Sequence, residues 1–281
     1  LGVLDAAVLL VSSADKVTGH VKTLWSLLKR HNVPTFIFVN KMDISAYERS
    51  VLMGGLSSRL DGGCIDFSAS RSRDELFEEV AVRDEVLMDD FLENGEITPE
   101  NIRRAISERK LFPCFFGSAL KLDGIDEFLS GLDFYTEEKT CTNEFGARAF
   151  KITEEQGVRL THLKITGGSL KVKSFLTEDA EEGKEPEKIN QIRIYSGTKF
   201  EMVNEAEAGT ICAVTGPALT KPGQGYGLEK ETGSPLLEPV LTYQVILPAG
   251  CDAHTMLKNL RLLEEEDPQL HIVWNEVLAE L

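Results

Sequence analysis

Four consecutive residues, Asn40-Lys41-Met42-Asp43, bring an amide, a cation and a carboxylate together directly after an apolar run at 34–39. If that run is a buried parallel strand, the loop at its carboxyl end lies at the edge of the sheet where ligands bind. The Asp43 carboxylate could then accept two hydrogen bonds from the N1 and N2 hydrogens of guanine, which adenine does not offer. Asn40 could hold neighbouring loops and the base edge, while the stem of Lys41 covers the purine face. The alternative is an ordinary strand-to-helix turn capped by Asn40 and Asp43.

A second loop of the same kind, Gly117-Ser118-Ala119-Leu120-Lys121, follows the apolar run at 111–117. Its exposed backbone N–H groups could donate to O6 of guanine. The small side chain of Ala119 lets the backbone approach a base closely, and the Ser118 hydroxyl can brace the loop. The candidate nucleotide-binding residues are therefore Asn40, Lys41, Asp43, Ser118, Ala119 and Leu120.

The elements that must position these loops alternate between strands and helices. Apolar runs predict buried parallel strands at 3–13, 34–39 and 111–117, and helical spacing with capping signals predicts helices at 17–29, 72–93, 98–108 and 124–135. Gly95 is expected to stop the long helix, and Thr98-Pro99 to start the next one. This alternation predicts an α/β domain with parallel strands over residues 1–137.

The sequence changes character after residue 137. Short β-type segments separated by glycine, proline and acidic turns predict a small antiparallel β-barrel over 143–238, with a charged hairpin loop at 178–188. A strand at 243–249, a helix at 252–265 and a strand beginning at 270–274 predict the start of an α+β domain over 240–281. The predicted fold class is therefore multidomain.

The composition is typical of a folded protein without membrane spans. The 281 residues are 42% hydrophobic, enough for the cores of about two domains, and no apolar run approaches the ~18 residues that a membrane helix needs. There are 46 acidic residues against 30 basic ones, and the net charge of −16 disfavours general coating of nucleic acid. The five cysteines contain no C-x-x-C motif, which favours reduced thiols and a cytoplasmic location.

Both loops, each after a buried strand and in this order, resemble the guanine-specificity loops of P-loop GTPases. The resemblance implies a partial GTPase α/β domain that binds GTP or GDP, with Mg²⁺ in the parent protein. The sequence contains neither G-x-x-x-x-G-K-[ST] nor D-x-x-G, which hold the phosphates and the metal in such proteins. We therefore expect a central fragment of a longer protein, whose first strand corresponds to the fourth of six. Alone it is expected to hydrolyse no GTP and to contribute no catalytic or metal-binding residue.

Later motifs narrow the resemblance. The segments 158–161 (VRLT), 167–171 (GGSLK) and 208–214 (AGTICAV) resemble the β-barrel second domain of the elongation factor G group, and 264–268 (EEEDP) resembles the end of the first helix in that group's third domain. The glycine at 167 and Thr210 depart from the group's usual residues. Neither departure changes the expected fold.

The spacing of the two loops suggests a particular branch of the group. Only 74 residues separate Asp43 from Ser118, whereas elongation factor G usually carries an extra subdomain between the corresponding loops. The compact arrangement is most similar to the tetracycline-resistance ribosomal protection proteins, which implies a ribosome-acting translation factor that dislodges tetracycline. The alternatives are an elongation factor G paralogue, a release-factor-type GTPase and, from another class, a non-catalytic module that binds the ribosome or another partner.

Two further expectations concern surfaces. Arg159, Lys164, Lys171 and Lys173 are concentrated in an otherwise acidic barrel and could touch ribosomal RNA phosphates, although a solvated strand face is the alternative. The strand at 3–13 would have an unpaired edge and apolar side chains on both faces. We expect self-association through this strand, or local disorder of the segment, as a consequence of truncation.

Overall fold

The computed structural model describes residues 1–281 apart from residues 16, 138–139, 177–187, 231–240, 249 and 276–281. Contacts divide the chain into two compact units, the first ending at residue 139 and the second beginning at residue 140. Each unit has its own sheet and its own hydrophobic core. Among the described residues, no helix has the length and apolar character needed to cross a membrane.

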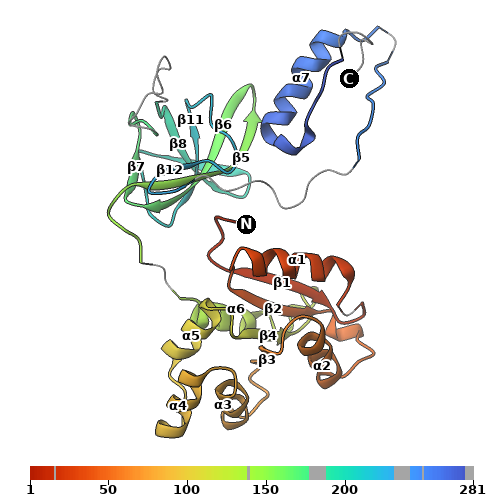
Figure 1. The fold of residues 1–281 in the computed structure, drawn as a ribbon, viewed down its shortest axis with the longest axis vertical. Helices are drawn as coiled ribbons and strands as arrows, with labels where there is room; N and C mark the ends of the chain where they lie inside the picture. The colour runs from red at the N-terminus through yellow and green to blue at the C-terminus, as the bar shows by residue number, and fades with distance from the viewer. Residues whose placement is uncertain (16, 138–139, 177–187, 231–240, 249, 276–281) are drawn as a thin grey trace. The chain divides into compact units, whose positions relative to one another are not determined.

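The sheet of the first unit is parallel (Figure 1). Its strands are β1 (Ala7–Ser12), β2 (Thr35–Asn40), β3 (Cys64–Asp66) and β4 (Phe112–Phe116), in the order β1-β2-β4-β3. The three strands predicted from apolar runs therefore lie side by side, as expected. Strand β3 was not predicted, because three residues are too few for hydrophobic periodicity to reveal.

The helices of the first unit differ from the prediction in two places. They are α1 (Gly19–Arg30), α2 (Arg49–Arg59), α3 (Arg73–Ala81), α4 (Glu85–Asn94), α5 (Pro99–Ser107) and α6 (Ile125–Tyr135). The single helix predicted at 72–93 is wrong, because Asp84 starts a new helix by accepting a hydrogen bond from the backbone N–H of Val86 at 3.1 Å. Helix α2 was missed, since the Gly54-Gly55 pair in its middle disfavours a helix.

The predicted capping signals are largely confirmed. Gly95 ends α4 in the left-handed conformation with φ 72°, and Pro99 occupies the first turn of α5. Thr98 is the N-cap of α5, but its side chain does not cap this helix. The Thr98 hydroxyl instead donates to Asp90 of α4 at 2.9 Å, so it joins two helices.

Alternating side chains give the two faces of the sheet separate cores. On one face Ile37 packs in a cluster with Trp25 of α1 and Leu56 of α2. On the other face Phe38 packs against Phe128 of α6, with ring centroids 5.2 Å apart, in a cluster completed by α3, α4 and α5. Strands β2 and β4 are buried on both faces as a result, which fixes the positions of the loops at their carboxyl ends.

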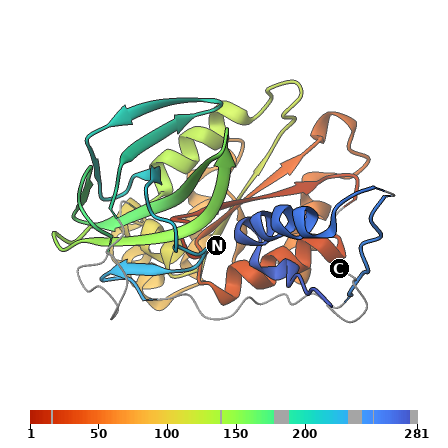
Figure 2. The same ribbon diagram turned by 90° about the horizontal axis from the view of Figure 1, so that it is seen from above.

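The second unit contains the predicted antiparallel β structure. A six-stranded sheet has the order β12 (Gly225–Gly227), β5 (Gly146–Glu155), β6 (Val158–Gly167), β11 (Ile211–Thr215), β8 (Gln191–Ser196) and β9 (Lys199–Val203), and β7 (Ser169–Lys171) pairs with β10 (Glu205–Glu207). Strands β5 and β6 form a long hairpin (Figure 2). The predicted charged loop at 178–188 lies, except for residue 188, outside the described residues.

The C-terminal segment agrees with the prediction only in part. Helix α7 (Ala253–Glu266) forms as expected, with the Asp252 carboxylate accepting from the backbone N–H of Thr255 at 2.8 Å. The predicted strands at 243–249 and 270–274 are wrong for the described residues, which are irregular except for a 3₁₀ turn, η2 (Pro268–Leu270), and an isolated bridge at Asn275. A strand needs a neighbour to receive its hydrogen bonds, and among the described residues neither segment has a neighbouring strand.

Candidate functional site

The two predicted loops meet at the carboxyl edge of the parallel sheet, and Asn40 joins them. Asn40 is the last residue of β2, and its Oδ1 accepts from the backbone N–H of Lys41 at 2.7 Å and from that of Ala119 at 2.9 Å. Lys41 has a left-handed backbone with φ 67°, which turns the chain into the short 3₁₀ helix η1 (Met42–Ile44). One amide oxygen therefore fixes the distance between two loops that are far apart in the sequence.

The loop after β4 is a closed turn. Ser118 and Asp123 exchange two backbone hydrogen bonds, of 2.9 and 3.1 Å, which pin the two ends of the turn together. Gly117 is required just before it, because a Cβ there would collide with the backbone oxygen of Asp123. The turn presents Ala119 and Leu120 to solvent, and the Leu120 side chain is 91% exposed.

The Asp43 carboxylate faces this turn. Its side chain is only 16% exposed, and Nζ of Lys121 lies 3.4 Å from its Oδ2. A side-chain hydrogen bond from Ser118 lowers the pKa of Asp43, partial burial opposes this shift, and Lys121 lowers the pKa further. Asp43 is therefore ionised at neutral pH and can accept hydrogen bonds from a ligand.

Backbone and hydroxyl groups of the neighbouring strands hold the first loop in place. The Ser13 hydroxyl, directly after β1, donates to the carbonyl of Lys41 at 2.9 Å. The backbone N–H of Met42 donates to the carbonyl of Gly117 at 3.0 Å, and that of Gly117 to the carbonyl of Val39 at 3.0 Å. The ends of three parallel strands thus determine the geometry of the site.

This arrangement has the chemistry to bind a flat base that carries both donors and acceptors. An anionic carboxylate and an amide that orders two backbone N–H groups lie at the sheet edge, beside the exposed residues Ala119 and Leu120. The structure brings together Asn40, Lys41, Asp43, Ser118 and Ala119, whereas the Leu120 side chain extends into solvent. The purely structural alternative, in which Asn40 and Asp43 only cap a turn, does not explain the contacts of both side chains with the second loop.

Two residues were not among the candidates although they contribute to the site. Ser13 holds the carbonyl of Lys41, and Lys121 forms the ion pair with Asp43. Ser13 directly follows an apolar run, as Asn40 does. Its position at the end of a predicted strand was therefore the available signal. Lys121 belongs to the second motif, but its spacing from Asp43 depends on the turn and cannot be read from the sequence.

The four basic residues predicted to contact RNA are not equally available. Lys164 is 8% exposed and its Nζ donates to the carbonyl of Gly209 at 2.8 Å. Arg159 donates to the hydroxyl of Thr220 at 2.8 Å and to other oxygens of the second unit. Lys171 and Lys173 are exposed. The inward contacts of Arg159 and Lys164 are structural, because they satisfy oxygens within their own unit.

The described residues offer no separate metal site. No group of three or more His, Cys, Asp or Glu side chains among them is arranged to hold a metal ion. The polar groups that converge at the sheet edge are suited to a base, and the sequence contains no glycine-rich motif that could cradle phosphates.

Comparison with known proteins shows similarity to a GTP-binding domain and to elongation factors. Residues 1–138 match the family model "Elongation factor Tu GTP binding domain". Similar curated proteins include elongation factor G 1 of Bdellovibrio bacteriovorus, which is 25% identical over 349 residues that cover 97% of this chain and 49% of that protein. Elongation factor G of Ureaplasma parvum serovar 3 is 26% identical over 352 residues, covering 98% of this chain and 50% of that protein. The chain thus spans about half the length of the curated relatives it matches.

A solved structure has the same fold. It is the crystal structure of the Thermus thermophilus protein ttk003000868, and it matches with a TM-score of 0.79 at 19% identity over 99% of this chain and 50% of that chain. The fold of a parallel α/β unit followed by a β-rich unit is therefore shared with a solved structure, and the α/β unit is the part that matches the GTP-binding family model.

Proposed function

We propose that this chain is the central part of a ribosome-acting translational GTPase of the elongation factor G type, and that Asn40, Lys41, Asp43, Ser118, Ala119 and Leu120 read the guanine base of GTP or GDP. The observation that carries the proposal is the bond from Ala119 to Asn40, which joins the two loops beside the Asp43 carboxylate. The match of residues 1–138 to a GTP-binding domain supports it.

The residues would divide the recognition of guanine between them. Asp43 is ionised and would accept from N1–H and N2–H, and a base without these donors would cover the carboxylate without pairing it. Within the turn at 118–120, the backbone N–H groups of Ser118 and Ala119 already donate to the Asp123 carbonyl and to Asn40, so the donor for O6 would be the backbone N–H of Leu120. The Lys41 stem and the exposed Leu120 side chain offer apolar surface for the base. The phosphates and Mg²⁺ would be held by segments that these 281 residues do not contain.

The base site can be tested on this chain, because the two loops are proposed to contact the guanine base and not the phosphates. Guanosine, titrated while amide NMR signals are followed, should shift the signals of Lys41 and Ala119. Asp43→Asn should weaken guanosine at least tenfold and improve xanthosine, because an asparagine amide can donate to the C2 oxygen of xanthine. The control is Asp123→Asn, which places the same change on an exposed side chain of the neighbouring turn.

Two results would count against this assignment. Guanosine could shift signals elsewhere in the chain, or Asp43→Asn could leave the preference between guanosine and xanthosine unchanged. In the second case the two loops would be an ordinary strand-to-helix junction.

The finer proposal is a tetracycline-resistance ribosomal protection protein acting in the cytoplasm. The short segment between the two loops supports it, and the aligned regions of the elongation factor G relatives are longer than this whole chain. An elongation factor G paralogue remains the second candidate, because the curated matches are elongation factors G. For ribosome contact, the exposed Lys171 and Lys173 are the better candidates of the four basic residues.

A growth experiment separates these candidates. A tetracycline-sensitive bacterium expresses the complete coding region, and the tetracycline concentration that stops its growth is measured. A protection protein should raise the tetracycline concentration that stops growth, and Asp43→Asn should abolish the effect. Loss of guanosine selectivity in Asp43→Asn without any tetracycline protection would favour the paralogue. Ribosome binding that is unaffected by guanine nucleotides would favour the non-catalytic module.

A further inference from the structure

Lys121 lies in the candidate base site, although the function proposed above gives it no part. Its backbone N–H donates to the carbonyl of Ser118 at 3.1 Å, which fixes the start of its side chain within the closed turn. That side chain is 62% exposed, and its Nζ lies 3.4 Å from Oδ2 of Asp43. The turn therefore holds an ammonium group beside one of the two oxygens of this carboxylate.

The carboxylate of Asp43 already has two partners within the chain. The Ser118 hydroxyl donates a hydrogen bond to it and Lys121 forms the ion pair, and both contacts lower the pKa of Asp43. Hydrogen bonds to a charged acceptor are the stronger ones, and an ammonium beside Oδ2 reduces the negative charge that this oxygen offers to a further donor. A ligand that needs both oxygens of Asp43 must therefore compete with Lys121 for Oδ2.

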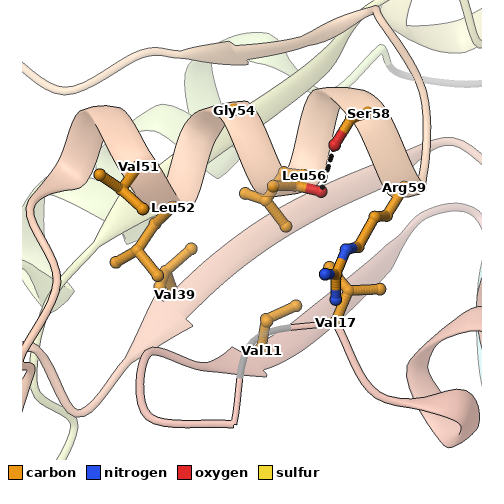
Figure 3. A pocket seen from close by; sticks show the side chains of 10 residues that line it. Val11, Val17, Val39, Val51, Leu52, Gly54, Leu56, Ser58 and Arg59 are labelled. Carbon is orange, nitrogen blue, oxygen red and sulfur yellow. Dashed lines mark hydrogen bonds between the residues drawn. The ribbon is translucent and has the colours of Figure 1, made fainter.

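The strand end that carries Asp43 is held by packing. Val39, near the end of β2, lies in a buried cluster with Val11 and Leu52, and Figure 3 shows Leu52 extending from α2 toward Val39. Because this end of β2 is fixed, the exposed side chain of Lys121, and not the loop that carries Asp43, is the part that can move aside for a base.

Guanine and hypoxanthine differ only in the group at C2, which decides how many carboxylate oxygens each base can use. Guanine offers N1–H and the 2-amino group, which pair with two oxygens, whereas hypoxanthine offers N1–H alone. Hypoxanthine can use the oxygen that Lys121 does not hold, while guanine must displace the ammonium from Oδ2. The gain from the 2-amino group is therefore partly offset by the loss of the ion pair.

We propose that Lys121 is a specificity-determining residue, which competes with the 2-amino group of guanine for Oδ2 of Asp43 and so lowers the preference for guanine over hypoxanthine. The proposal rests on the function proposed for the base site. Displacement of Lys121 costs little free energy, because its side chain is mostly exposed and the ammonium can return to water. The ion pair thus adjusts the affinity for guanine without preventing its binding.

The affinities of guanosine and inosine for the 281-residue chain test this role, with the amide NMR signals of Lys41 and Ala119 followed during titration. Lys121→Met should tighten guanosine about two- to fourfold, the factor that an exposed ion pair is worth, and should leave inosine unchanged. High salt weakens exposed ion pairs, so it should tighten guanosine in wild type but not in Lys121→Met.

Two further variants serve as controls. Lys121→Arg keeps a cation within reach of Oδ2 and should retain the wild-type ratio of the guanosine and inosine affinities. Lys29→Met removes the same charge from an exposed position in the last turn of α1, and it should change neither affinity.

The outcomes separate this role from the base site itself. An unchanged or weaker guanosine affinity in Lys121→Met, or equal tightening of guanosine and inosine, would overturn the role of Lys121 while guanosine binding that depends on Asp43 leaves the base site standing. If guanosine shifts the signals of neither Lys41 nor Ala119 in wild type, the base site fails and the role of Lys121 fails with it.

Discussion

At the scale of single residues, Asn40 controls the geometry of the candidate base site. Its Oδ1 is shared between Lys41 in its own loop and Ala119 in the loop after β4. The loops are also joined by the backbone bond from Met42 to Gly117 and by the contacts of Asp43 with Ser118 and Lys121. Loss of the Asn40 amide should therefore loosen the second loop at Ala119 without disturbing the strands.

We expect Asn40→Ala to weaken guanosine binding and to accelerate hydrogen exchange at the Ala119 amide. Both backbone N–H groups lose their acceptor, and the unfolding free energy should fall by about 1–2 kcal/mol. Amide hydrogen exchange followed by NMR measures the first effect, and urea unfolding measures the second. Asn204→Ala, at an exposed position of the second unit, is the control. Unchanged protection of Ala119 would contradict the role given to Asn40.

At the scale of elements, Asp90 connects α4 to α5. Its carboxylate is 9% exposed and accepts from the backbone N–H of Thr98 at 2.8 Å, from the Thr98 hydroxyl at 2.9 Å, from Asn101 at 2.7 Å and from Asn94 at 2.8 Å. These hydrogen bonds, that from the Thr98 backbone first, lower the pKa of Asp90 to about 2. The junction between two helices therefore depends on one ionised side chain.

Asp90→Ala should lower the unfolding free energy by roughly 2 kcal/mol at neutral pH, in line with the lowered pKa. A carboxyl with a lowered pKa stabilises the fold above its unfolded-state pKa, and the contribution disappears as the pH falls toward about 2. Urea unfolding measures this effect. The unfolding free energies of wild type and variant should differ strongly at pH 7 and little near pH 2. Asp89→Ala, the exposed neighbour, should have little effect at either pH. An equal loss at both pH values would show that packing, and not charge, explains the effect.

At the scale of the whole molecule, β1 is the longer of the two edge strands of the described parallel sheet, the other being β3. Among the described residues it pairs only with β2, and alternate side chains point to opposite faces. Leu9 and Val11 are buried under the helices, whereas Val8 is 41% and Leu10 is 60% exposed. An apolar edge strand with unpaired hydrogen-bonding groups is a template for association with another chain.

We therefore predict that the 281-residue chain self-associates through β1. Leu10→Lys should shift it toward the monomer without loss of stability, because the side chain is exposed and the charge is unfavourable in a strand-to-strand contact. Light scattering across a concentration series measures the change. Leu4→Lys, which alters an exposed leucine outside β1, is the control. A wild-type chain that is monomeric at all concentrations would refute the prediction.

The sequence alone determined the features that depend on local patterns. Apolar runs located β1, β2 and β4, because strands buried on both faces are continuous in hydrophobicity. The motifs at 40–43 and 117–121 could be recognised because each follows such a run. The capping residue Gly95 was also readable, since its φ of 72° is a local requirement.

Only the tertiary structure decided which distant groups meet. The bond from Ala119 to Asn40 and the pair of Lys121 with Asp43 span more than seventy residues, so no local pattern contains them. Burial likewise separated Lys164 from the exposed Lys171, although both are lysines of the same acidic unit. The strands predicted at 243–249 and 270–274 did not form in the described residues, because a strand is stabilised by its neighbours and not by its own sequence.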